Sequence, residues 1–547
     1  MFGLKGAYFY LVAVQITLIK LIKKIYFTTN RYNKSLRSKV PISVYFNPNP
    51  FLLSIISPFK RKSFKFNEIN PNNFWLENKD KDIKDHHNFL WLNLIDRKID
   101  GKNIQKIIYL WMLKYSNYKK KIWDTSTLSR RVISWLLNVD IIINNGTFDF
   151  KKNFFQSIIS QCNHLKKNIS FEKDYQKKVE IITALIISGI IFKEYEENYS
   201  LGIKELEKFV KSYFDGEGFP LTRNPNDLVF FTKFFLLSYE VIKDAQQYIP
   251  EFLDDIIKKN LSCIKFIKTP NDQIPFFNGG SENYLVDLDR YLENLKLNKK
   301  MKKNMIGGIF YAKTRNQVIY FDVGSPPNKN FSRSYQSGPL SFEYFLDDIK
   351  IISNCGFGEN ISSKAKLISR LTASQSTLTI NDTSATQFER NKLINRVFGQ
   401  SVKNTFKTGD LIIKNDNQLV GCSAIHNGYE KNFGCIHKRE VYLDGKNNKL
   451  AGVDHILKKS DGIPIRYVFR FHLNPALTAI KTMSGNGALI QISRNKSLLF
   501  SIKDEKLEIE KSIFLGGKKI LDSTCISISG NLVNKNKSFY WEIRKKI

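Results

Sequence analysis

The sequence predicts an α+β multidomain protein in which a helical first half is followed by a large antiparallel β-sandwich. The first observation is a change in hydrophobic period near Ile306, from about 3.6 residues before it to about 2 after it. The second is the length of 547 residues, which exceeds what one hydrophobic core supports. The third is composition: 42% apolar and 13% aromatic residues supply sizeable cores and exclude a disordered chain.

The chain divides into three predicted segments. They are an N-terminal helix with an extended segment at 1–84, a helical domain at 85–300 and a β-sandwich domain at 301–547. The apolar run 7–19 is followed by Lys20, Lys23 and Lys24, and it is too short for a comfortable membrane span. We expect an amphipathic helix lying on the protein or making peripheral contact with a membrane. An uncleaved export signal is the alternative.

Residues 86–267 carry apolar side chains at three- and four-residue steps, as amphipathic helices do. The clearest runs are 104–115 and 128–143. The segment Glu180–Tyr195 is apolar nearly all round, which predicts a helix buried on most sides. Successive helical hairpins with short polar turns, and without an internal sequence repeat, indicate an α/α-toroid or a solenoid.

Beyond Ile306 the chain breaks into short alternating segments rich in β-branched and aromatic residues and separated by turns. The predicted strands include 318–323, 411–413, 423–425, 440–443, 465–471, 488–492, 498–502 and 539–543. Such a series is typical of a large antiparallel sandwich. We place the boundary between helices and strands near residue 300, within the Lys-rich stretch 295–304.

The chain is strongly basic, with 85 Lys and Arg against 51 Asp and Glu and a formal net charge of +34. Such a charge favours an acidic partner, namely a polyanionic polysaccharide, an anionic lipid or a nucleic acid. No nucleic-acid-binding motif is present, so we expect no nucleic acid. A general enrichment in Lys, Asn, Ile and Phe is the alternative source of the charge.

Six cysteines are widely spaced and form no C-x-x-C pair, which argues against a zinc ribbon or thioredoxin-like chemistry. Buried free thiols are the default interpretation. Cys422 and Cys435 are near enough in sequence to meet across a hairpin, and the sequence leaves their pairing open.

Two stretches stand out, Tyr335–Gly356 and Arg370–Ala385. In each, small residues and an amide (Gln336 or Gln375) come directly before a strand that we expect in the core. Such residues mark the rim of a site, or they form an ordinary β-turn that leads into the strand. The residues alone leave both interpretations open.

Here the sequence resembles a known family. The motifs, in chain order, are HHNFLWLNLIDRKIDGKNIQKIIYLWMLKY (86–115), LSRRVISWL (128–136), DGEGFPLTRNPNDL (215–228), QSGPLSFEY with IISNCG, RLTASQSTLTINDTSA (370–385) and HNGYEKNFGCIHKRE (426–440). Their order is similar to that of the heparinase II/III-like proteins. The resemblance implies an α/α-toroid, as an incomplete helical barrel, followed by an antiparallel β-sandwich. It also implies a bacterial polysaccharide lyase, acting on glycosaminoglycans or other acidic polysaccharides in the periplasm or cell envelope; the cytoplasm is the alternative location.

A lyase of uronate-containing polysaccharides must neutralise the uronate carboxylate, remove the C5 proton and protonate the leaving oxygen. We expect the proton carriers in the sandwich, where two histidines and a tyrosine fall within a short loop: His426, Tyr429 and His437. The expected substrate-binding residues are Arg223, Asn224, Asn278, Gln336, Glu343, Asn354, Gln375, Arg439 and His472.

Each candidate has a structural alternative. Arg223 and Asn224 precede Pro225, so they also fit the cap of the next helix. Asn278 stands before two glycines and fits a plain turn. A strand histidine is more often a satisfied structural residue than a catalytic one. Glu343 requires a partner if its face of the strand is buried.

The departures from the family pattern bear on activity. Metal-binding members of the resembling family place His where this chain has Gln336 and Gln375, and Asp where it has Asn354. Neutral amides are weak ligands for zinc, so we expect neither a metal nor another cofactor. The family's catalytic tyrosine is not found within 215–228.

Two functions therefore remain open at this point. The first is a lyase that cleaves an acidic polysaccharide by β-elimination. The second is a catalytically inactive relative that binds or helps process a cell-surface glycan. A membrane-surface protein held by its basic N-terminal helix is a third, weaker interpretation. The sequence does not indicate an oligomeric state.

Overall fold

The computed structural model describes residues 4–57, 71–75, 83–95, 101–144, 146–294, 304–416, 419–459, 464–533 and 536–545. The chain forms two compact units, Met1–Tyr213 with Val229–Lys258, and Phe214–Leu228 with Lys259–Ile547. Two helices, α10 (Pro225–Asp244) and α11 (Glu251–Ile267), each contribute to both units. Residues 295–303, where we placed the predicted boundary, lie outside the described residues.

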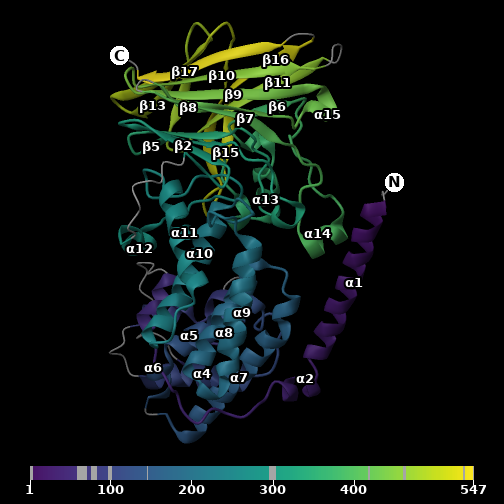
Figure 1. Cartoon of the computed structure of the whole chain (residues 1–547), viewed down its shortest axis with the longest axis vertical. Helices are drawn as coiled ribbons and strands as arrows, with labels where there is room; N and C mark the ends of the chain where they lie inside the picture. Colours follow the sequence, from purple (N-terminus) through teal and green to yellow (C-terminus); the bar gives the residue numbers. More distant parts are fainter. Residues whose placement is uncertain are drawn as a thin grey trace. The chain divides into compact units, whose positions relative to one another are not determined.

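The first unit is built from helices, and Figure 1 shows α4 to α9 packed beside one another. The α-helices are α1 (Leu4–Phe27), α2 (Asn30–Ser35), α3 (Ile83–His87), α4 (Gly101–Tyr115), α5 (Thr125–Leu137), α6 (Val139–Ile143), α7 (Phe148–Asn168), α8 (Tyr175–Ile191) and α9 (Glu196–Tyr213). None of the described helices is long and apolar enough to cross a membrane.

Helix α8 forms the centre of the first unit. Asp174 accepts hydrogen bonds from the backbone N–H groups of Gln176 and Lys177, which caps the start of the helix. Every residue from Val179 to Ile191 is buried, and α8 packs against α5, α7 and α9. The predicted helix that is buried on most sides is therefore confirmed.

The second unit contains two antiparallel sheets. Their strands are β1 (Met305–Ile306), β2 (Ile309–Lys313), β3 (Gln317–Asp322), β4 (Phe342–Leu346), β5 (Ile349–Ser353), β6 (Leu378–Ile380), β7 (Thr408–Asn415), β8 (Leu419–His426), β9 (Cys435–Asp444), β10 (Lys449–Lys458), β11 (Ile465–Leu473), β12 (Thr478–Lys481), β13 (Gly487–Ser493), β14 (Lys496–Ile502), β15 (Glu508–Phe514), β16 (Leu521–Leu532) and β17 (Lys537–Lys545). One sheet has the order β1-β2-β3-β4-β5-β11-β16-β15, with β6 paired to β11. The other has the order β12-β13-β14-β17-β10-β9-β8-β7.

The two sheets share one apolar core. Phe342 of β4 stacks on Trp541 of β17 with ring centroids 5.5 Å apart, and Phe471 of β11 meets the same indole at 5.0 Å. These contacts join strands of different sheets, so the arrangement is a sandwich. The predicted succession of helices and then an antiparallel sandwich is confirmed.

All six cysteines are buried free thiols. Cys422 on β8 lies opposite Val441 of β9, and Cys435 on β9 lies opposite Lys458 of β10. The possible pairing of Cys422 with Cys435 is therefore absent from the structure.

Candidate functional site

The loop before α10 places Arg223 in the second unit, with its backbone in the left-handed region at φ 57°. All five N–H groups of its guanidinium have acceptors within the unit. These are the carbonyl oxygens of Gly307, Gly308, Gly324 and Ser325, at 2.9 to 3.1 Å, and the Asp322 carboxylate. A guanidinium has five N–H donors, so Arg223 has no donor left for a substrate carboxylate. We call this arrangement the Arg223 clamp.

Glycines make the close approach of this guanidinium possible. A Cβ atom on Gly324 would lie 2.3 Å from Nη2 of Arg223, and one on Gly308 would lie 2.6 Å from it. Both distances are too short for any side chain to be accommodated without displacing the clamp.

The Asp322 carboxylate extends the clamp toward Asn278. Oδ2 of Asp322 accepts a hydrogen bond from Nδ2 of Asn278 at 3.3 Å, while Oδ1 of Asn278 is buried without a partner among the described residues. The next residue, Gly279, donates its N–H to Oε1 of Gln336 at 2.9 Å. Asn278 therefore joins the clamp to the stretch that begins at Tyr335.

Asn224 has the capping role that we considered as its alternative. Its Oδ1 accepts the backbone N–H of Asn226 at 2.9 Å, with Pro225 as the first residue of α10. Its Nδ2 donates to Oγ of Ser334 at 3.2 Å. Asn224 is 5% exposed, so only a small part of its surface can contact a ligand.

The three amides at the aligned metal positions bind the protein backbone. Gln336 and Gln375 both donate to the carbonyl oxygen of Ser369, at 2.8 and 2.9 Å, and Asn354 accepts the N–H of Ser376 at 2.9 Å. Since the Gln336 amide oxygen already accepts the Gly279 N–H, it does not fit a metal ligand. Among the described residues, no group of three or more His, Cys, Asp and Glu is arranged to hold a metal ion.

A second buried network surrounds Asp454 on β10. Its carboxylate accepts hydrogen bonds from His437 at 2.7 Å, from Arg439 at 2.7 and 3.1 Å and from the Trp541 indole at 2.8 Å. Nε2 of His426 lies 3.2 Å from Nδ1 of His437. Arg439 also donates to the carbonyl oxygens of Leu340 and Ser376. Although burial opposes its ionisation, Asp454 keeps a pKa well below the usual range, mainly because of the Arg439 charge.

The structure places the predicted proton carriers His426, Tyr429 and His437 in the interior of the second unit. They are 0%, 1% and 1% exposed, so none of them reaches a polysaccharide on the surface of this unit. The Tyr429 hydroxyl donates to the Leu378 carbonyl at 2.9 Å, and burial raises its pKa. Burial also lowers the pKa of both histidines, so they are neutral. The three side chains are brought close together as predicted, but within the core of the sandwich.

Two further predicted substrate-binding residues, Glu343 and His472, also form their polar contacts within the protein. Glu343 is 0% exposed and forms an ion pair of 2.8 Å with Lys350, so it has the partner that burial requires. His472 lies 2.8 Å from Oγ of Ser512 and 3.0 Å from the Ala373 carbonyl oxygen. Burial lowers its pKa to about 4. Both residues serve the interior of the second unit.

A pocket of about 490 Å³ adjoins the Arg223 clamp within the second unit. Its lining includes Asp215, Glu217, Pro327 and Phe331, together with the glycines that surround the clamp. Carboxylates beside an aromatic ring suit sugar hydroxyls better than an anionic group. The Asp215 carboxylate already accepts two backbone N–H groups, from Glu217 and Phe219.

Sequence reasoning missed Asp322, Tyr335 and Asp454. Asp322 ends β3, one residue before the run Gly-Ser-Pro-Pro, and this position at the end of a core strand is a signal that could have identified it. Tyr335 opens the first central stretch and is fully buried. Its burial raises the pKa of its hydroxyl, and the Asp322 charge raises it further. Asp454 lies on a strand that the sequence analysis did not predict.

Residues 298–542 match the family model described as Heparinase II/III-like, C-terminal. A heparan sulfate lyase from Pedobacter heparinus is 15% identical with a TM-score of 0.62, covering 91% of this chain and 82% of that one. A crystal structure of heparinase III is 12% identical with a TM-score of 0.67, covering 97% and 91%. No curated protein matches significantly. The likeness is one of fold, and it confirms the predicted class, an α/α-toroid followed by an antiparallel β-sandwich.

Proposed function

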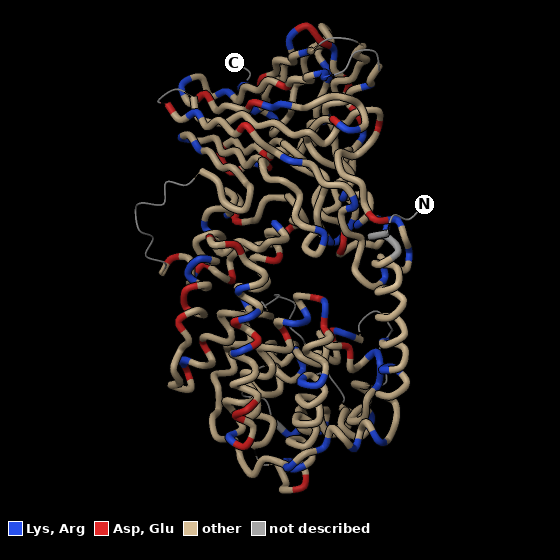
Figure 2. The backbone as a smooth tube through the Cα atoms, turned by 45° about the vertical axis from the view of Figure 1, so that its right-hand side comes forward, with Lys and Arg blue, Asp and Glu red and all other residues tan. Residues whose placement is uncertain are grey.

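The chain carries a heparinase II/III-like C-terminal domain over residues 298–542, and from this premise we propose that it binds an acidic, uronate-containing polysaccharide and helps process it. The fold supports a glycan as the ligand, because the similar solved structures named above are heparan sulfate lyase and heparinase III. The net charge of +34 supports an acidic one. In Figure 2, Lys and Arg are spread along the helical and the sheet parts of the chain.

One observation favours binding over elimination. Every side chain that the sequence marked for proton transfer is buried, and every N–H group of Arg223 is bound to the protein. A general acid or base must come within hydrogen-bond reach of the proton that it moves. His426, Tyr429 and His437 hold the sandwich together instead, through Asp454 and the Leu378 carbonyl.

A β-eliminating lyase is the second candidate function. The shared fold favours it, because the chain covers 91% of the heparinase III chain and 82% of the heparan sulfate lyase chain. In that case other residues than the three predicted ones must remove the C5 proton and protonate the leaving oxygen. The Asn224 amide remains a candidate for donating a hydrogen bond to the uronate carboxylate, because Nδ2 carries two N–H groups, the structure shows one bond from it, to Ser334, and the residue is not fully buried.

The test is to incubate the purified protein with heparan sulfate, chondroitin sulfate, alginate and polygalacturonate, with neutral dextran as the control. Ultraviolet absorbance from an unsaturated uronate reports elimination, and affinity electrophoresis reports binding. Retardation by an acidic polysaccharide without absorbance supports the first function. Absorbance that grows with enzyme concentration assigns the second. If neither absorbance nor retardation is observed with any acidic polysaccharide, both candidate functions are refuted.

A further inference from the structure

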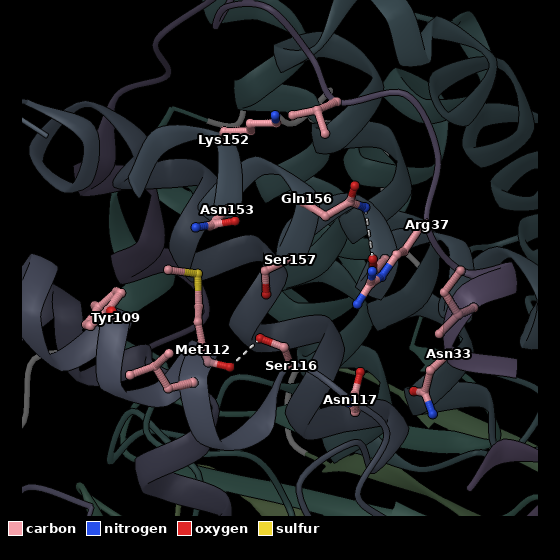
Figure 3. A pocket seen from close by; sticks show the side chains of 14 residues that line it. Asn33, Arg37, Tyr109, Met112, Ser116, Asn117, Lys152, Asn153, Gln156 and Ser157 are labelled. Atoms are coloured by element: carbon pink, nitrogen blue, oxygen red, sulfur yellow. Dashed lines mark hydrogen bonds between the residues drawn. The ribbon is translucent and has the colours of Figure 1, made fainter. Parts of the chain in front are cut away.

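A second pocket, of about 420 Å³, lies within the first unit. Figure 3 shows it between the chain that follows α2, the C-terminal part of α4 and the N-terminal half of α7. Its volume falls in the range of about 300–1,000 Å³ that is usual for small-molecule sites. This pocket is separate from the one beside the Arg223 clamp, because all of its lining residues belong to the helical unit.

The charges around this pocket are of one sign. Arg37 and Lys152 line it, and its lining contains no Asp or Glu. Neither cation pairs with a carboxylate in the part of the chain that the structure describes. In Figure 3 both side chains border the hollow, with Gln156 between them. An anionic group in the pocket would therefore meet two unpaired cations.

The neutral lining suits a sugar. Asn117 and Asn153 present amides, and Gln156 donates to Oγ of Ser160 at 3.2 Å with one of its two N–H groups. Tyr109 is 44% exposed and Leu113 is 67% exposed, so an apolar surface stands beside the polar groups. Amides match sugar hydroxyls as both donors and acceptors, while an exposed ring covers the C–H face of a pyranose.

We infer that this pocket binds one acidic sugar residue, through Arg37 and Lys152 on its carboxylate or sulfate group. The inference rests on the proposed function and adds a second contact point, in the helical unit, for the same class of polysaccharide. Two contact points on one chain raise the affinity for a polymer above that for a short fragment.

The test is calorimetric titration of the full chain with a glucuronate-containing disaccharide, with sodium sulfate and with glucose. The double variant Arg37→Gln/Lys152→Gln should weaken disaccharide binding about tenfold or more. Lys120→Gln is the matched control, because Lys120 is exposed in the same unit and does not line the pocket. Its affinity should stay within about twofold of the parent protein.

Each outcome separates the two proposals. The sugar site is refuted if the double variant binds the disaccharide as tightly as the parent protein does, or if sulfate binds as tightly as the disaccharide. Polymer binding by the parent protein would still support the proposed function in that case. Failure of the parent protein to bind any acidic polymer overturns the proposed function itself. Circular dichroism of the double variant shows that it is folded, so a loss of affinity is not a loss of structure.

A different observation concerns α1. Six of its large apolar side chains are more than half exposed: Tyr8, Leu11, Leu18, Leu21, Ile22 and Ile25. The C-terminal end of the helix is fixed to the first unit, because Phe27 stacks on Tyr32 with centroids 4.5 Å apart and Lys23 lies over the Phe171 ring. Residues 1–67 contain twelve Lys and Arg and no Asp or Glu. The helix itself carries four lysines and no Asp or Glu, so exposed apolar side chains and positive charge occur together on it.

We propose that α1 lies in the surface of an anionic lipid bilayer. Its exposed apolar side chains would enter the headgroup boundary, and Lys20 and Lys24 would meet the lipid phosphates. An apolar helix mounted on a folded unit buries this surface at a bilayer without further folding.

Co-sedimentation with vesicles tests this proposal. The full chain should pellet with phosphatidylglycerol vesicles and stay in solution with phosphatidylcholine vesicles. Lys20→Gln/Lys24→Gln should release at least half of it, whereas Lys518→Gln/Lys519→Gln, at exposed positions of the second unit, should not. Equal pelleting with both lipids, no pelleting with either, or equal release by the two variants would overturn the proposal.

Discussion

Replacing Arg223 with methionine should destabilise the second unit by about 3–5 kcal/mol. Methionine keeps the apolar stem and removes all five N–H donors. The change leaves the Asp322 carboxylate and four carbonyl oxygens without this partner. Since Arg223 is 9% exposed and Asp322 is 1% exposed, solvent screens the pair little. The magnitude is therefore that of breaking a buried pair rather than a surface one.

Hydrogen exchange followed by mass spectrometry measures the effect where it occurs, in peptides from β2 and β3. Arg494→Met is the matched control, because Arg494 is exposed in the turn between β13 and β14. The double variant Arg223→Met/Asp322→Asn should recover about 0.5–3 kcal/mol relative to Arg223→Met, because it no longer buries an unpaired charge.

The same variants separate a structural role from a role in binding. If Arg223 is a clamp, the folded fraction of Arg223→Met should bind an acidic polysaccharide as the parent protein does. If Arg223→Met loses less than about 1 kcal/mol of stability but binds the polysaccharide tenfold more weakly, the structural role of Arg223 is refuted and a role in ligand binding is supported.

Three further predictions follow from the buried groups and the charge. Stability should fall as the pH drops from about 6.5 to about 4. Burial lowers the pKa of His87 and His164 to about 3 and of His472 to about 4, so the unfolded chain binds protons that the folded chain does not, at about 1.4 kcal/mol per pH unit for each histidine. Asp215, Glu180 and Glu343, whose pKa burial raises, act in the opposite direction, but five histidines have a lowered pKa once His426 and His437 are included. A urea midpoint that rises on acidification would contradict the prediction. A chelator should leave thermal unfolding unchanged, because Gln336 and Gln375 donate to the Ser369 carbonyl; elemental analysis showing stoichiometric zinc with a chelator-dependent melt would disprove this. Affinity for an acidic polysaccharide should fall steeply with salt, since exposed charges are screened beyond about 8 Å at physiological ionic strength, and tight binding to dextran that ignores salt would count against it.

The order of helices and strands was predictable because it depends on local period. Helix α8 and the strands β3, β11 and β17 were each located from their apolar pattern. Strands β10 and β16 were missed for a physical reason. β10 carries Gly452 and Asp454 at buried positions, which interrupt its apolar alternation. β16 opens with a polar Asp-Ser-Thr run, and its apolar alternation is limited to Ile526 and Ile528.

The site was less predictable because its partners are backbone atoms distant in sequence. Arg223 bonds carbonyl oxygens 84 to 102 residues further along the chain, and no side-chain pattern reveals a carbonyl acceptor. The closeness of His426 and His437 followed from their spacing across a hairpin. Their burial did not, because it depends on the second sheet and on Trp541, whose indole bonds the shared Asp454.

The six buried thiols can report local unfolding in each of the two units. Cys162 belongs to α7 of the first unit and Cys525 to β16 of the second, and burial raises the pKa of both thiols, to about 12 for Cys162. A folded chain should therefore resist alkylation, because the thiolate is the reactive form and is sheltered. The mass increments acquired at each cysteine under mild denaturant would report which unit opens first, without any introduced label.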